Sequence, residues 1–383
     1  MRHLSGPIDR AIARSLAGAV LGGLVASPAL AQSTAEEEEQ SPTITEIVVT
    51  AQRRSESIQN VPISITAITG EKMDRTNVRG IEEIVASAPN VAVVNNGSRD
   101  RKEISIRGVG NLLDPYTPTR AATYGFYIDE FNVGVGTNNP NILDMERFEV
   151  LRGPQGTYFG RNAVGGAFNI STRKPTNEWY GEVNLGYSSF DTKRFSAIGN
   201  IPLIDNLLAI RLSGLVEESD GNIKNIGAGG GGNDSDYKSG RLVFRLTPGE
   251  RLVSDTTFSY SDEETGMRAG VPTGYLTATW RNVYYGGAAG LGDPDGVGFY
   301  PENKSRVNFN SPMAVGNEFW YVSNRTVYEF DSFSTTFVAG YLESEVFQLG
   351  DVDGSSRDYF NEDQVIDRTS RSAELRFQSN DGG

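Results

Sequence analysis

The second half of the chain alternates apolar and polar residues, which indicates strands with one face of each kind. In the segment 207–216, Leu208, Ile210 and Leu212 alternate with Arg211 and Ser213. Because successive side chains of a strand point to opposite faces, this period of two predicts β-strands rather than helices. The same pattern makes eight segments in all, the others near 179–188, 193–201, 238–246, 252–261, 318–330, 332–347 and 368–378.

The connections between these segments alternate in length from the second one on. The short ones are PLIDN, TPGE and FDS, and the long ones cover 219–237, 262–317 and about 349–366. Barrels of the outer membrane have long loops outside the cell, short turns in the periplasm and aromatic residues at both strand ends. We therefore expect an antiparallel transmembrane sheet, with Gly229 to Gly232 outside and Pro248-Gly249 in the periplasm. On periodicity alone, a soluble β-sandwich is the alternative.

The first half has shorter and less regular strand signals, together with one helical stretch. Residues 71–88 carry the helical signals, with Ile81, Ile84 and Val85 on one face. Strand-like runs follow at 91–94, 104–107, 124–129, 147–151 and 167–172. This mixture predicts an α+β domain in front of the long strands.

The glycine-rich stretch 147–175 organises this domain. A strand with Phe148 and Val150 leads into a turn, and a second strand, AFNIST, follows. Proline fixes φ and glycine allows positive φ, so the Gly-Pro-x-Gly sequence predicts a tight strand–turn–strand element. A dinucleotide fingerprint or a phosphate loop is the competing interpretation. The first needs a βαβ context and the second a Gly-Lys-Ser/Thr sequence, and the stretch offers neither.

The N-terminus predicts export. Residues 1–31 combine early arginines, an apolar run at 17–25 that is too short to span a bilayer, and the small-x-small pattern Ala29-Leu30-Ala31. We expect cleavage of this signal peptide before Gln32; a buried N-terminal helix is the alternative. Residues 32–54 begin with an acidic, polar stretch that cannot bury enough apolar surface to offset its ordering entropy, so a flexible periplasmic segment is expected.

Six residues at the end of this tether suit β-strand addition to another protein. They are Glu46, Ile47, Val48, Val49, Thr50 and Ala51. Three consecutive β-formers on a flexible tether can pair with the edge of a partner's sheet, where backbone hydrogen bonds give affinity and the apolar side chains fill pockets. A plain edge strand of the following domain is the alternative.

Five pieces of the chain together resemble TonB-dependent outer-membrane receptors. They are EIVVTA at 46–51, NVPISITAI at 60–68, ISIRGVG at 104–110, YIDEFNV at 127–133 and the glycine-rich stretch 147–175. Their order and spacing are similar to those of the family. The resemblance is close over 45–175, and after residue 175 it is limited to the general pattern of the strands. The resemblance implies a TonB box at 46–51, a plug domain at 55–175 and an N-terminal part of a transmembrane β-barrel at 176–383.

The resemblance also implies roles for particular residues. The matched plug motifs contain Arg107, Gly108, Arg152, Gly153, Pro154, Gly156, Gly160, Arg161, Gly165 and Gly166. We expect Arg107, Arg152 and Glu149 to be internal charges that pair across the boundary between plug and barrel, with simple solvation as the alternative. In the family, plug loops such as 108–125 point outward and touch ligand. The ligand-contact candidates are therefore Tyr116, Arg120 and Tyr124, with ordinary loop residues as the alternative.

Composition excludes several kinds of site. The net charge of −14 argues against nucleic acid as a partner. The absence of cysteine excludes disulfides and thiolate metal sites. The single histidine, His3, lies in the expected signal peptide, so the mature chain has no residue for a histidine-based triad or a usual zinc site. Carboxylate-based catalysis stays open, but no carboxylate pair stands out from the solvated ones. We therefore expect no catalytic residue, no metal and no cofactor.

The function implied by the resemblance is active uptake of a scarce ligand across the outer membrane of a Gram-negative bacterium. Ligand would bind at the outer loops and the plug, and TonB would pull on residues 46–51; no chemistry is expected. A ferric siderophore is the family's commonest ligand, with cobalamin, glycans or other large nutrients as alternatives. The expected partners are TonB, outer-membrane lipid and this ligand. The rivals are a passive β-rich adhesin or structural surface protein and a periplasmic carbohydrate-active enzyme.

The number of strands is small for such a receptor. A plugged transporter barrel has about 22 strands, whereas eight leave room only for side chains. The chain also ends in SNDGG without a terminal aromatic residue. These observations predict an incomplete barrel in the N-terminal part of a larger receptor, present as a fragment or a truncated product. Open strand edges leave backbone groups unsatisfied in hydrocarbon, so the 383-residue chain alone is expected neither to insert nor to transport.

Overall fold

The computed structural model describes residues 47–50, 53–54, 56–76, 78, 80–95, 102–110, 123–134, 143–160, 163–266, 305–351, 358 and 361–380. All structural features described below belong to these residues. The expected signal peptide and most of the expected tether lie outside them. Residues Glu46–Gly383 form one compact unit, so contacts between its first and second halves are part of a single body.

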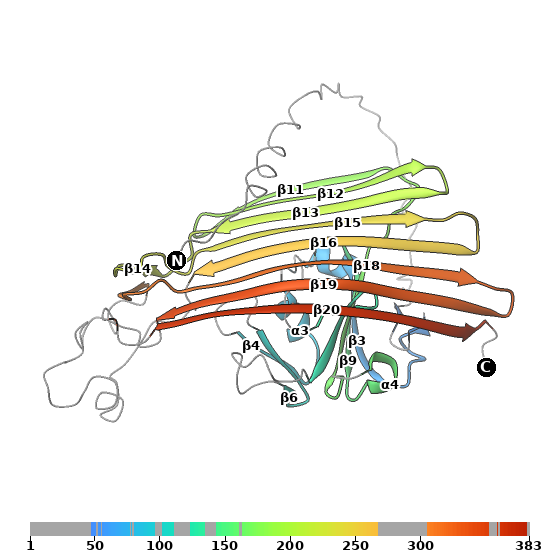
Figure 1. Ribbon diagram of the computed structural model, residues 1–383, viewed down its shortest axis with the longest axis horizontal. Coiled ribbons are helices and arrows are strands. Elements are labelled where there is room, and N and C mark those ends of the chain that lie inside the picture. Colours follow the sequence, from blue (N-terminus) through green and yellow to red (C-terminus); the bar gives the residue numbers. More distant parts are fainter. Residues whose placement is uncertain are drawn as a thin grey trace, which may run out of the picture. The chain divides into compact units, whose positions relative to one another are not determined.

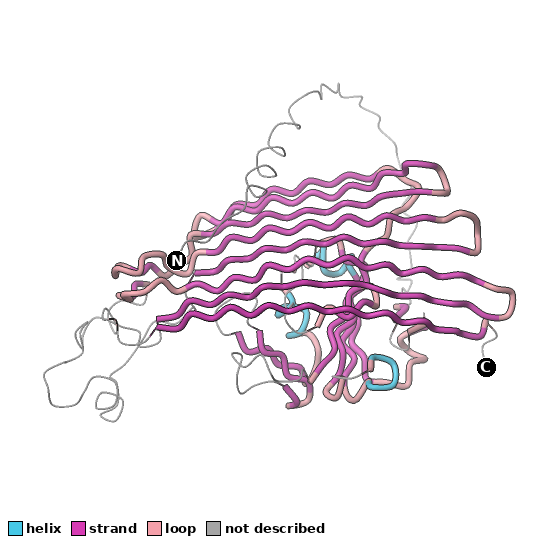
Figure 2. Tube along the Cα trace, viewed as in Figure 1, coloured by secondary structure: helices cyan, strands magenta, loops and turns pink. Residues whose placement is uncertain are grey.

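Eight long strands form one antiparallel sheet, called here the outer sheet, and lie side by side in chain order (Figures 1 and 2). They are β11 (Tyr180–Ser188), β12 (Thr192–Ile204), β13 (Leu208–Ser219), β15 (Ser235–Leu246), β16 (Leu252–Gly266), β18 (Ala314–Glu329), β19 (Phe333–Asp351) and β20 (Asn361–Ser379). Each pairs with the next through a long register, such as Leu252 opposite Tyr328 through to Gly266 opposite Ala314. The eight strands predicted from the alternation are confirmed.

Several strands extend beyond their predicted ends, toward the long connections. β19 runs to Asp351 and β20 begins at Asn361, whereas the apolar alternation covers only 332–347 and 368–378. The additional part of β20 includes Glu362 and Asp363, which pair with Gly350 and Leu349. There both faces of the strand carry polar residues. The alternation signal therefore disappears before the backbone pairing does.

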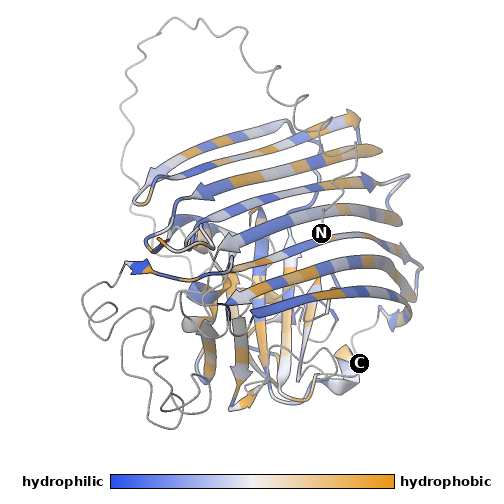
Figure 3. Ribbon diagram, turned by 60° about the vertical axis from the view of Figure 1, so that its left-hand side comes forward, coloured by the Kyte–Doolittle hydropathy of each residue, from blue (hydrophilic) through white to orange (hydrophobic). Residues whose placement is uncertain are grey.

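The outer sheet exposes its apolar face and buries its polar face. Leu185 is 82% exposed and Phe377 is 69% exposed, while Asn200, Arg211 and Ser261 on the opposite face are buried. Apolar and polar residues alternate visibly along the strands (Figure 3). A sheet whose exposed face is apolar suits lipid rather than water as its solvent. The predicted fold class, an α+β domain followed by antiparallel transmembrane strands, is confirmed, and the barrel is incomplete.

Aromatic residues on the exposed face lie at two levels, that is, at two heights along the strand direction. Tyr260 lies opposite Trp320 near the middle of β16 and β18, and Tyr328 contacts Phe330, which stacks on Phe333, near a short turn. Along β18, Tyr328 follows Trp320 by eight positions. At about 3.4 Å per residue and a tilt of about 40°, the two levels lie about 20 Å apart, close to the height of an outer-membrane apolar band. Among the described residues, no helix has the length and apolarity needed to cross a membrane.

The first half forms an inner domain around a five-stranded sheet of order β3-β9-β10-β7-β8. Its strands are β3 (Ser64–Thr69), β9 (Met145–Arg152), β10 (Gly166–Thr172), β7 (Tyr124–Ile128) and β8 (Phe131–Asn132). β10 is parallel to β7 and antiparallel to β9. Phe168 is central in the core, with its ring against Phe126 and Phe148. The predicted strand-like runs at 124–129, 147–151 and 167–172 are confirmed.

Smaller elements complete the inner domain. They are the paired strands β1 (Val48–Val49) and β2 (Glu56–Ser57), the three-stranded sheet of β4 (Val91–Asn95), β5 (Lys102–Ile106) and β6 (Val109–Gly110), and the helices α2 (Gly70–Arg75), α3 (Ile81–Ala86) and α4 (Gly156–Phe159). The helical stretch 71–88 thus consists of two helices, because Thr76 and Gly80 between them have low helix propensity. The prediction of a simple turn between β9 and β10 was wrong in one respect, since α4 lies there.

Two long connections contact each other through a pairing that the sequence did not predict. β14 (Lys224–Asn225) and β17 (Arg306–Val307) form a short parallel ladder. The Asn225 side chain completes the contact: its Nδ2 donates to the carbonyl of Phe309 at 3.2 Å, and its Oδ1 accepts the Phe309 N–H at 2.9 Å. The connection that follows β13 and the connection that precedes β18 are therefore held against each other by this ladder and by Asn225.

Candidate functional site

The segment predicted to bind a partner strand is docked on the inner domain. In the β1–β2 pair, Val48 lies opposite Ser57 and Val49 opposite Glu56. Val49 is fully buried, whereas Val48 is 43% exposed. Among the described residues, β1 has β2 as its single strand neighbour. The segment thus has one anchored side chain and a second edge, which is the geometry that strand addition uses.

A buried carboxylate holds the end of this segment. The Thr50 N–H donates to Glu149 Oε1 at 2.7 Å, and the Thr50 hydroxyl lies 3.2 Å from both carboxylate oxygens. Arg147 Nε donates to Glu149 at 2.6 Å, and Asn169 Nδ2 donates to Glu149 Oε2 at 2.8 Å and to the Thr50 hydroxyl at 2.9 Å. Glu149 is 0% exposed. Because an unpaired buried charge is costly, this cluster fixes the position of Thr50.

Arg53 follows the docked segment and is enclosed by the inner domain. Its guanidinium lies 4.3 Å from the Phe159 ring centroid and 4.8 Å from that of Tyr127. Its Nε donates to the carbonyl of Tyr158 at 3.1 Å, and its Nη1 lies 3.7 Å from Glu130 Oε2. Only 7% of the Arg53 side chain is exposed. Arg53 is thus held by cation–π contacts, a hydrogen bond and an ion pair.

The carboxylate of Glu130 links the inner domain to two strands of the outer sheet. Arg325 on β18 donates to Glu130 Oε1 at 2.6 Å, and Arg376 on β20 donates to Oε2. Burial by itself raises the pKa of Glu130. The guanidiniums of Arg325 and Arg376 outweigh burial and hold the pKa below its usual range. Glu130 is therefore a charged bridge at neutral pH.

A second ion network crosses to the opposite half of the outer sheet. Asp144 accepts two hydrogen bonds from Arg211 on β13, at 2.7 and 2.5 Å. Arg241 on β15 donates to the carbonyls of Leu143 and Asp144 at 2.8 and 3.1 Å. The Asp144 side chain is 1% exposed. A bidentate pair buried to this degree fixes orientation as well as proximity.

Asp129 fixes the end of β10 from within the inner domain. Its carboxylate accepts the N–H of Thr172 at 2.9 Å and the Thr172 hydroxyl at 2.6 Å, and Lys174 Nζ lies 2.6 Å away. Burial raises the pKa of Asp129. The Lys174 ammonium and the donors of Thr172 outweigh burial and lower the pKa below its usual value.

Apolar contacts accompany the ion networks. The Phe131 ring on β8 lies 5.7 Å from that of Tyr321 on β18. Phe131 also covers Gly340 on β19, where an added Cβ would come within 2.5 Å of the ring. The buried core of the inner domain continues into Val338 and Leu342 of the outer sheet. The two halves thus share one packed interface.

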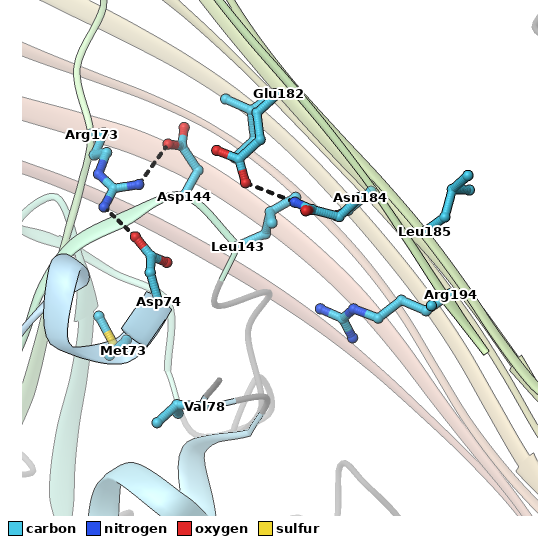
Figure 4. A pocket seen from close by; sticks show the side chains of 13 residues that line it. Met73, Asp74, Val78, Leu143, Asp144, Arg173, Glu182, Asn184, Leu185 and Arg194 are labelled. Atoms are coloured by element: carbon cyan, nitrogen blue, oxygen red, sulfur yellow. Dashed lines mark hydrogen bonds and ion pairs between the residues drawn. The ribbon is translucent and has the colours of Figure 1, made fainter. Parts of the chain in front are cut away.

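A polar cavity of roughly 390 Å³ lies between α2 and the strands β11 and β12. Arg173 bridges Asp144 and Asp74 at its wall, and Glu182 accepts a hydrogen bond from Asn184 (Figure 4). The lining carries charges of both signs, each with a hydrogen-bond or ion-pair partner: Arg173 pairs with Asp74 and Asp144, and Arg194 pairs with Glu217 outside the cavity. Such a lining suits water and hydrophilic groups better than an apolar ligand.

The plug-motif residues lie close together around the glycine-rich turn. The Gly153 N–H donates to the carbonyl of Gly165 at 2.9 Å. Gly166 has a φ of 154°, and a Cβ there would lie 2.2 Å from the carbonyl oxygen of Leu151. Pro154, Gly156 and Gly160 flank or belong to α4, and Gly108 follows Arg107 after β5. Arg161 lies outside the described residues.

The charged residues of these motifs do not make the expected contacts. Glu149 bonds to Arg147, Thr50 and Asn169, and Arg152 donates to the carbonyl of Pro89 at 2.9 Å. For these two, the expected pairing across the plug–barrel boundary was wrong, because their partners belong to the inner domain. Arg107 is exposed.

The remaining site predictions fall partly outside the described residues. Tyr116 and Arg120 lie outside them, as do Glu46 and Ala51 of the predicted strand-addition segment 46–51, called here the coupling segment. Tyr124 is 3% exposed, and its ring meets Phe168 edge-on at 5.3 Å. A contact between Tyr124 and ligand stays a prediction.

Sequence reasoning missed the acidic residues that join the two halves. Glu130 lies within the matched YIDEFNV piece, and Asp144 lies just before the glycine-rich stretch. Both have positive φ, 70° and 62°. A charged residue at such a φ marks a position constrained by its surroundings. The sequence signal was an acidic residue next to an apolar strand, but its arginine partners lie far away along the chain.

Comparisons with known proteins agree with this architecture. Residues 57–167 match the family model described as TonB-dependent Receptor Plug Domain. The chain is 28% identical over 323 residues to an iron-regulated outer membrane virulence protein of Vibrio cholerae, covering 78% of this chain and 47% of that protein. It is 32% identical over 238 residues to the pesticin receptor of Yersinia pestis, covering 60% and 33%. The chain thus spans half or less of the length of these relatives.

Solved structures show the same fold. The ferric yersiniabactin uptake receptor of Yersinia pestis matches with a TM-score of 0.66 and 18% identity, over 84% of this chain and 46% of that one. The ferripyoverdine receptor of Pseudomonas aeruginosa matches with a TM-score of 0.64 and 16% identity, over 96% and 46%. The chain therefore carries the plug domain of the TonB-dependent receptors, followed by eight antiparallel strands of their outer-membrane barrel type.

Proposed function

We propose that this chain serves TonB-dependent uptake of a ferric siderophore across the outer membrane. The names of its relatives support an iron-related ligand, since they include a ferric enterobactin receptor and a ferripyoverdine receptor, both of Pseudomonas aeruginosa. Cobalamin, glycans and other large nutrients are the alternative ligands. Because the chain covers only part of these relatives, the transport activity of the whole protein belongs to the proposal.

The outer membrane is the location of the protein. The first relatives are outer membrane proteins by name, and the apolar exposed face of the outer sheet agrees with that location. The polar groups of the sheet face the inner domain instead of lipid, as in barrels with a filled interior.

The observation that carries the proposal is the docked strand β1. Its exposed Val48 and its second edge suit strand addition by the periplasmic protein TonB, while Val49, Thr50 and Arg53 tie it to the plug. A pull on residues 46–51 then acts on the Glu149 cluster and on Arg53. In this proposal the protein binds and moves its ligand and performs no chemistry on it.

The test uses Val48→Pro in the receptor that contains this chain, produced in a TonB-positive host. Proline removes the backbone N–H and disfavours an added strand, so uptake of an iron-labelled siderophore should fall to the level of a TonB-negative host. Binding of the siderophore to whole cells should stay unchanged. Val48→Ala, which keeps the N–H, is the matched control and should transport normally.

Two outcomes decide against the proposal. Normal uptake by the Val48→Pro variant would show that residues 46–51 are not the coupling segment. A receptor that binds none of the tested ferric siderophores, but takes up cobalamin or an oligosaccharide with TonB, would keep the transport class and replace the ligand. A passive surface adhesin would be indifferent to both TonB and Val48→Pro.

A further inference from the structure

One arginine on the inner face of the outer sheet, Arg368 on β20, differs from the other arginines on that face. The others all pair with carboxylates; they are Arg194, Arg211, Arg241, Arg245, Arg325 and Arg376. Within the described part of the chain, the Arg368 side chain makes neither an ion pair nor a hydrogen bond. The inner face thus carries one guanidinium whose charge is not matched by the protein described here.

The pairing of β20 with β19 places Arg368 on the inner face, just beyond the plug. Its register partner is Ser344, which is 6% exposed. Arg368 is half-buried, while both of its neighbours along the strand are exposed. The next inward position toward the short turns is Ser370, which lies opposite Leu342 of the core shared with the plug. Arg368 therefore lies at the edge of the plug contact, on the side of the long connections.

The inward carboxylates of β20 are too far away to pair with Arg368. They are Glu362 and Glu374, each six positions along the strand, which is about 20 Å. Both have other partners, because Gln348 donates to Glu362 at 2.8 Å and Arg376 lies 3.5 Å from Glu374. The inward positions next to Arg368 on β19 and β20 are uncharged: Ile366, Ser370, Leu342, Ser344 and Val346. A half-buried guanidinium without an acceptor is costly, so this position calls for an anion.

The paired arginines have structural roles that Arg368 lacks. Arg211 and Arg325, for example, hold the plug carboxylates Asp144 and Glu130. Those pairs are complete without ligand. The guanidinium of Arg368 keeps its planar fork of donors for an oxyanion, and such a fork matches a carboxylate or two adjacent phenolate oxygens.

From this geometry we propose that Arg368 is an anion-binding residue of the ligand site. The ligand is then an iron complex with anionic oxygens on its surface, such as carboxylates or catecholates. The inference rests on the proposed function, which makes the ligand a ferric siderophore, and it narrows the class of siderophore. Neutral hydroxamate complexes carry no group that needs this guanidinium.

The first measurement tests whether the guanidinium is free in the receptor that contains this chain. Among the described residues, β20 has β19 as its single strand neighbour (Figure 1), so a carboxylate from another part of the receptor is the competing partner. In ligand-free outer membranes, p-hydroxyphenylglyoxal modifies accessible arginines, and peptide mass spectrometry measures the rate at each one. Arg368 should react roughly tenfold faster than the ion-paired Arg376, the ratio that corresponds to about 1.4 kcal/mol.

The second measurement compares the binding of three iron-labelled complexes to whole cells. Ferric enterobactin and ferric dicitrate are anionic, and ferrichrome is neutral. Arg368→Gln should weaken binding of the anionic complex that the receptor takes by about tenfold or more, as expected for loss of a charge-assisted hydrogen bond. Arg368→Lys keeps the charge without the fork and should lie between Arg368→Gln and the parent. The thermal unfolding temperature of the ligand-free receptor should stay unchanged in both variants, since no protein contact is lost.

Arg371→Gln is the matched control. Arg371 lies three positions further along β20 on the exposed face, with its guanidinium 5.2 Å from the ring centroid of Tyr341. Both substitutions remove one positive charge from the same strand, so they change the net charge equally. The Arg371→Gln receptor should bind the anionic complex as the parent does.

Three results would overturn the inference. They are an Arg368 that reacts as slowly as Arg376 in the ligand-free receptor, an equal loss of binding for Arg371→Gln, and a receptor that binds neither anionic complex. None of these results depends on TonB. Normal uptake by the Val48→Pro variant would therefore refute the coupling segment and leave the assignment of Arg368 standing, and the two ideas fail separately.

Discussion

Single buried carboxylates carry much of the plug's organisation. Glu149 holds the coupling segment, Asp144 and Glu130 reach the outer sheet, and Asp129 fixes the end of β10. A buried carboxylate is stable only while its cation and its donors stay in place. Each of these residues therefore acts on several neighbours at once, and substitution of one should affect more than one contact.

Glu149→Gln tests this at the coupling segment. The change leaves Arg147, whose side chain is 11% exposed, without its closest anionic partner. The free energy of unfolding of the plug should fall by about 3 kcal/mol, the usual result of breaking a buried ion pair. Glu146→Gln is the control, because Glu146 is 52% exposed and lies 3.6 Å from Arg147. It should change stability by less than about 0.5 kcal/mol. Equal effects in denaturant unfolding would contradict the assignment.

Individual strands of the plug meet the outer sheet through close packing. Phe131 on β8 covers Gly340 on β19, and no side chain fits between them. Gly340→Val should therefore displace the Phe131 ring and lower stability by about 1–3 kcal/mol, as overpacking does. Gly240→Val is the control, since a Cβ at Gly240 meets nothing within 4 Å. Thermal unfolding of both variants in detergent measures the difference. A stable Gly340→Val protein would show that β8 does not pack on β19.

The elements differ in how far the sequence could predict them. The outer strands were predictable because one apolar face against lipid imposes a period of two over many residues. Their polar ends, such as Glu362 and Asp363 of β20, carry no such period. The β14–β17 ladder and the bridges from Glu130 to Arg325 and Arg376 were not predictable, since they join residues far apart in sequence. The motif residues around Gly166 were predictable as a turn, but α4 was not.

Across the whole molecule, the plug is attached to the outer sheet by two ion networks on different strands. Asp144 reaches β13, and Glu130 reaches β18 and β20. Apolar contact between Phe131 and Tyr321 lies beside the second network. The attachment therefore depends on ionised carboxylates at its edges and on apolar packing between them.

The attachment through Glu130 and the end of β10 held by Asp129 should both weaken in acid. The pKa values of Asp129 and Glu130 are lowered in the folded protein. A lowered folded-state pKa contributes stability that is fully present above the unfolded value, about 4, and is lost as pH falls through the folded value. Protease resistance of the plug should thus be constant between pH 5 and 8 and should decline below about pH 4. A decline near pH 6 would contradict this assignment. Glu130→Gln should make the decline of protease resistance below about pH 4 less steep.

The strand order of the plug also constrains how it can be made. β3 pairs with β9, Ser64 opposite Arg152, and β7 pairs in parallel with β10, Tyr124 opposite Gly166. A chain that enters the periplasm N-terminus first therefore delivers β3 and β7 long before their partners. Contacts of high sequence separation form slowly and leave apolar strands open to aggregation in the meantime. Folding of this plug should thus be completed only once the glycine-rich turn has crossed the inner membrane, and the early strands stay open to aggregation until then.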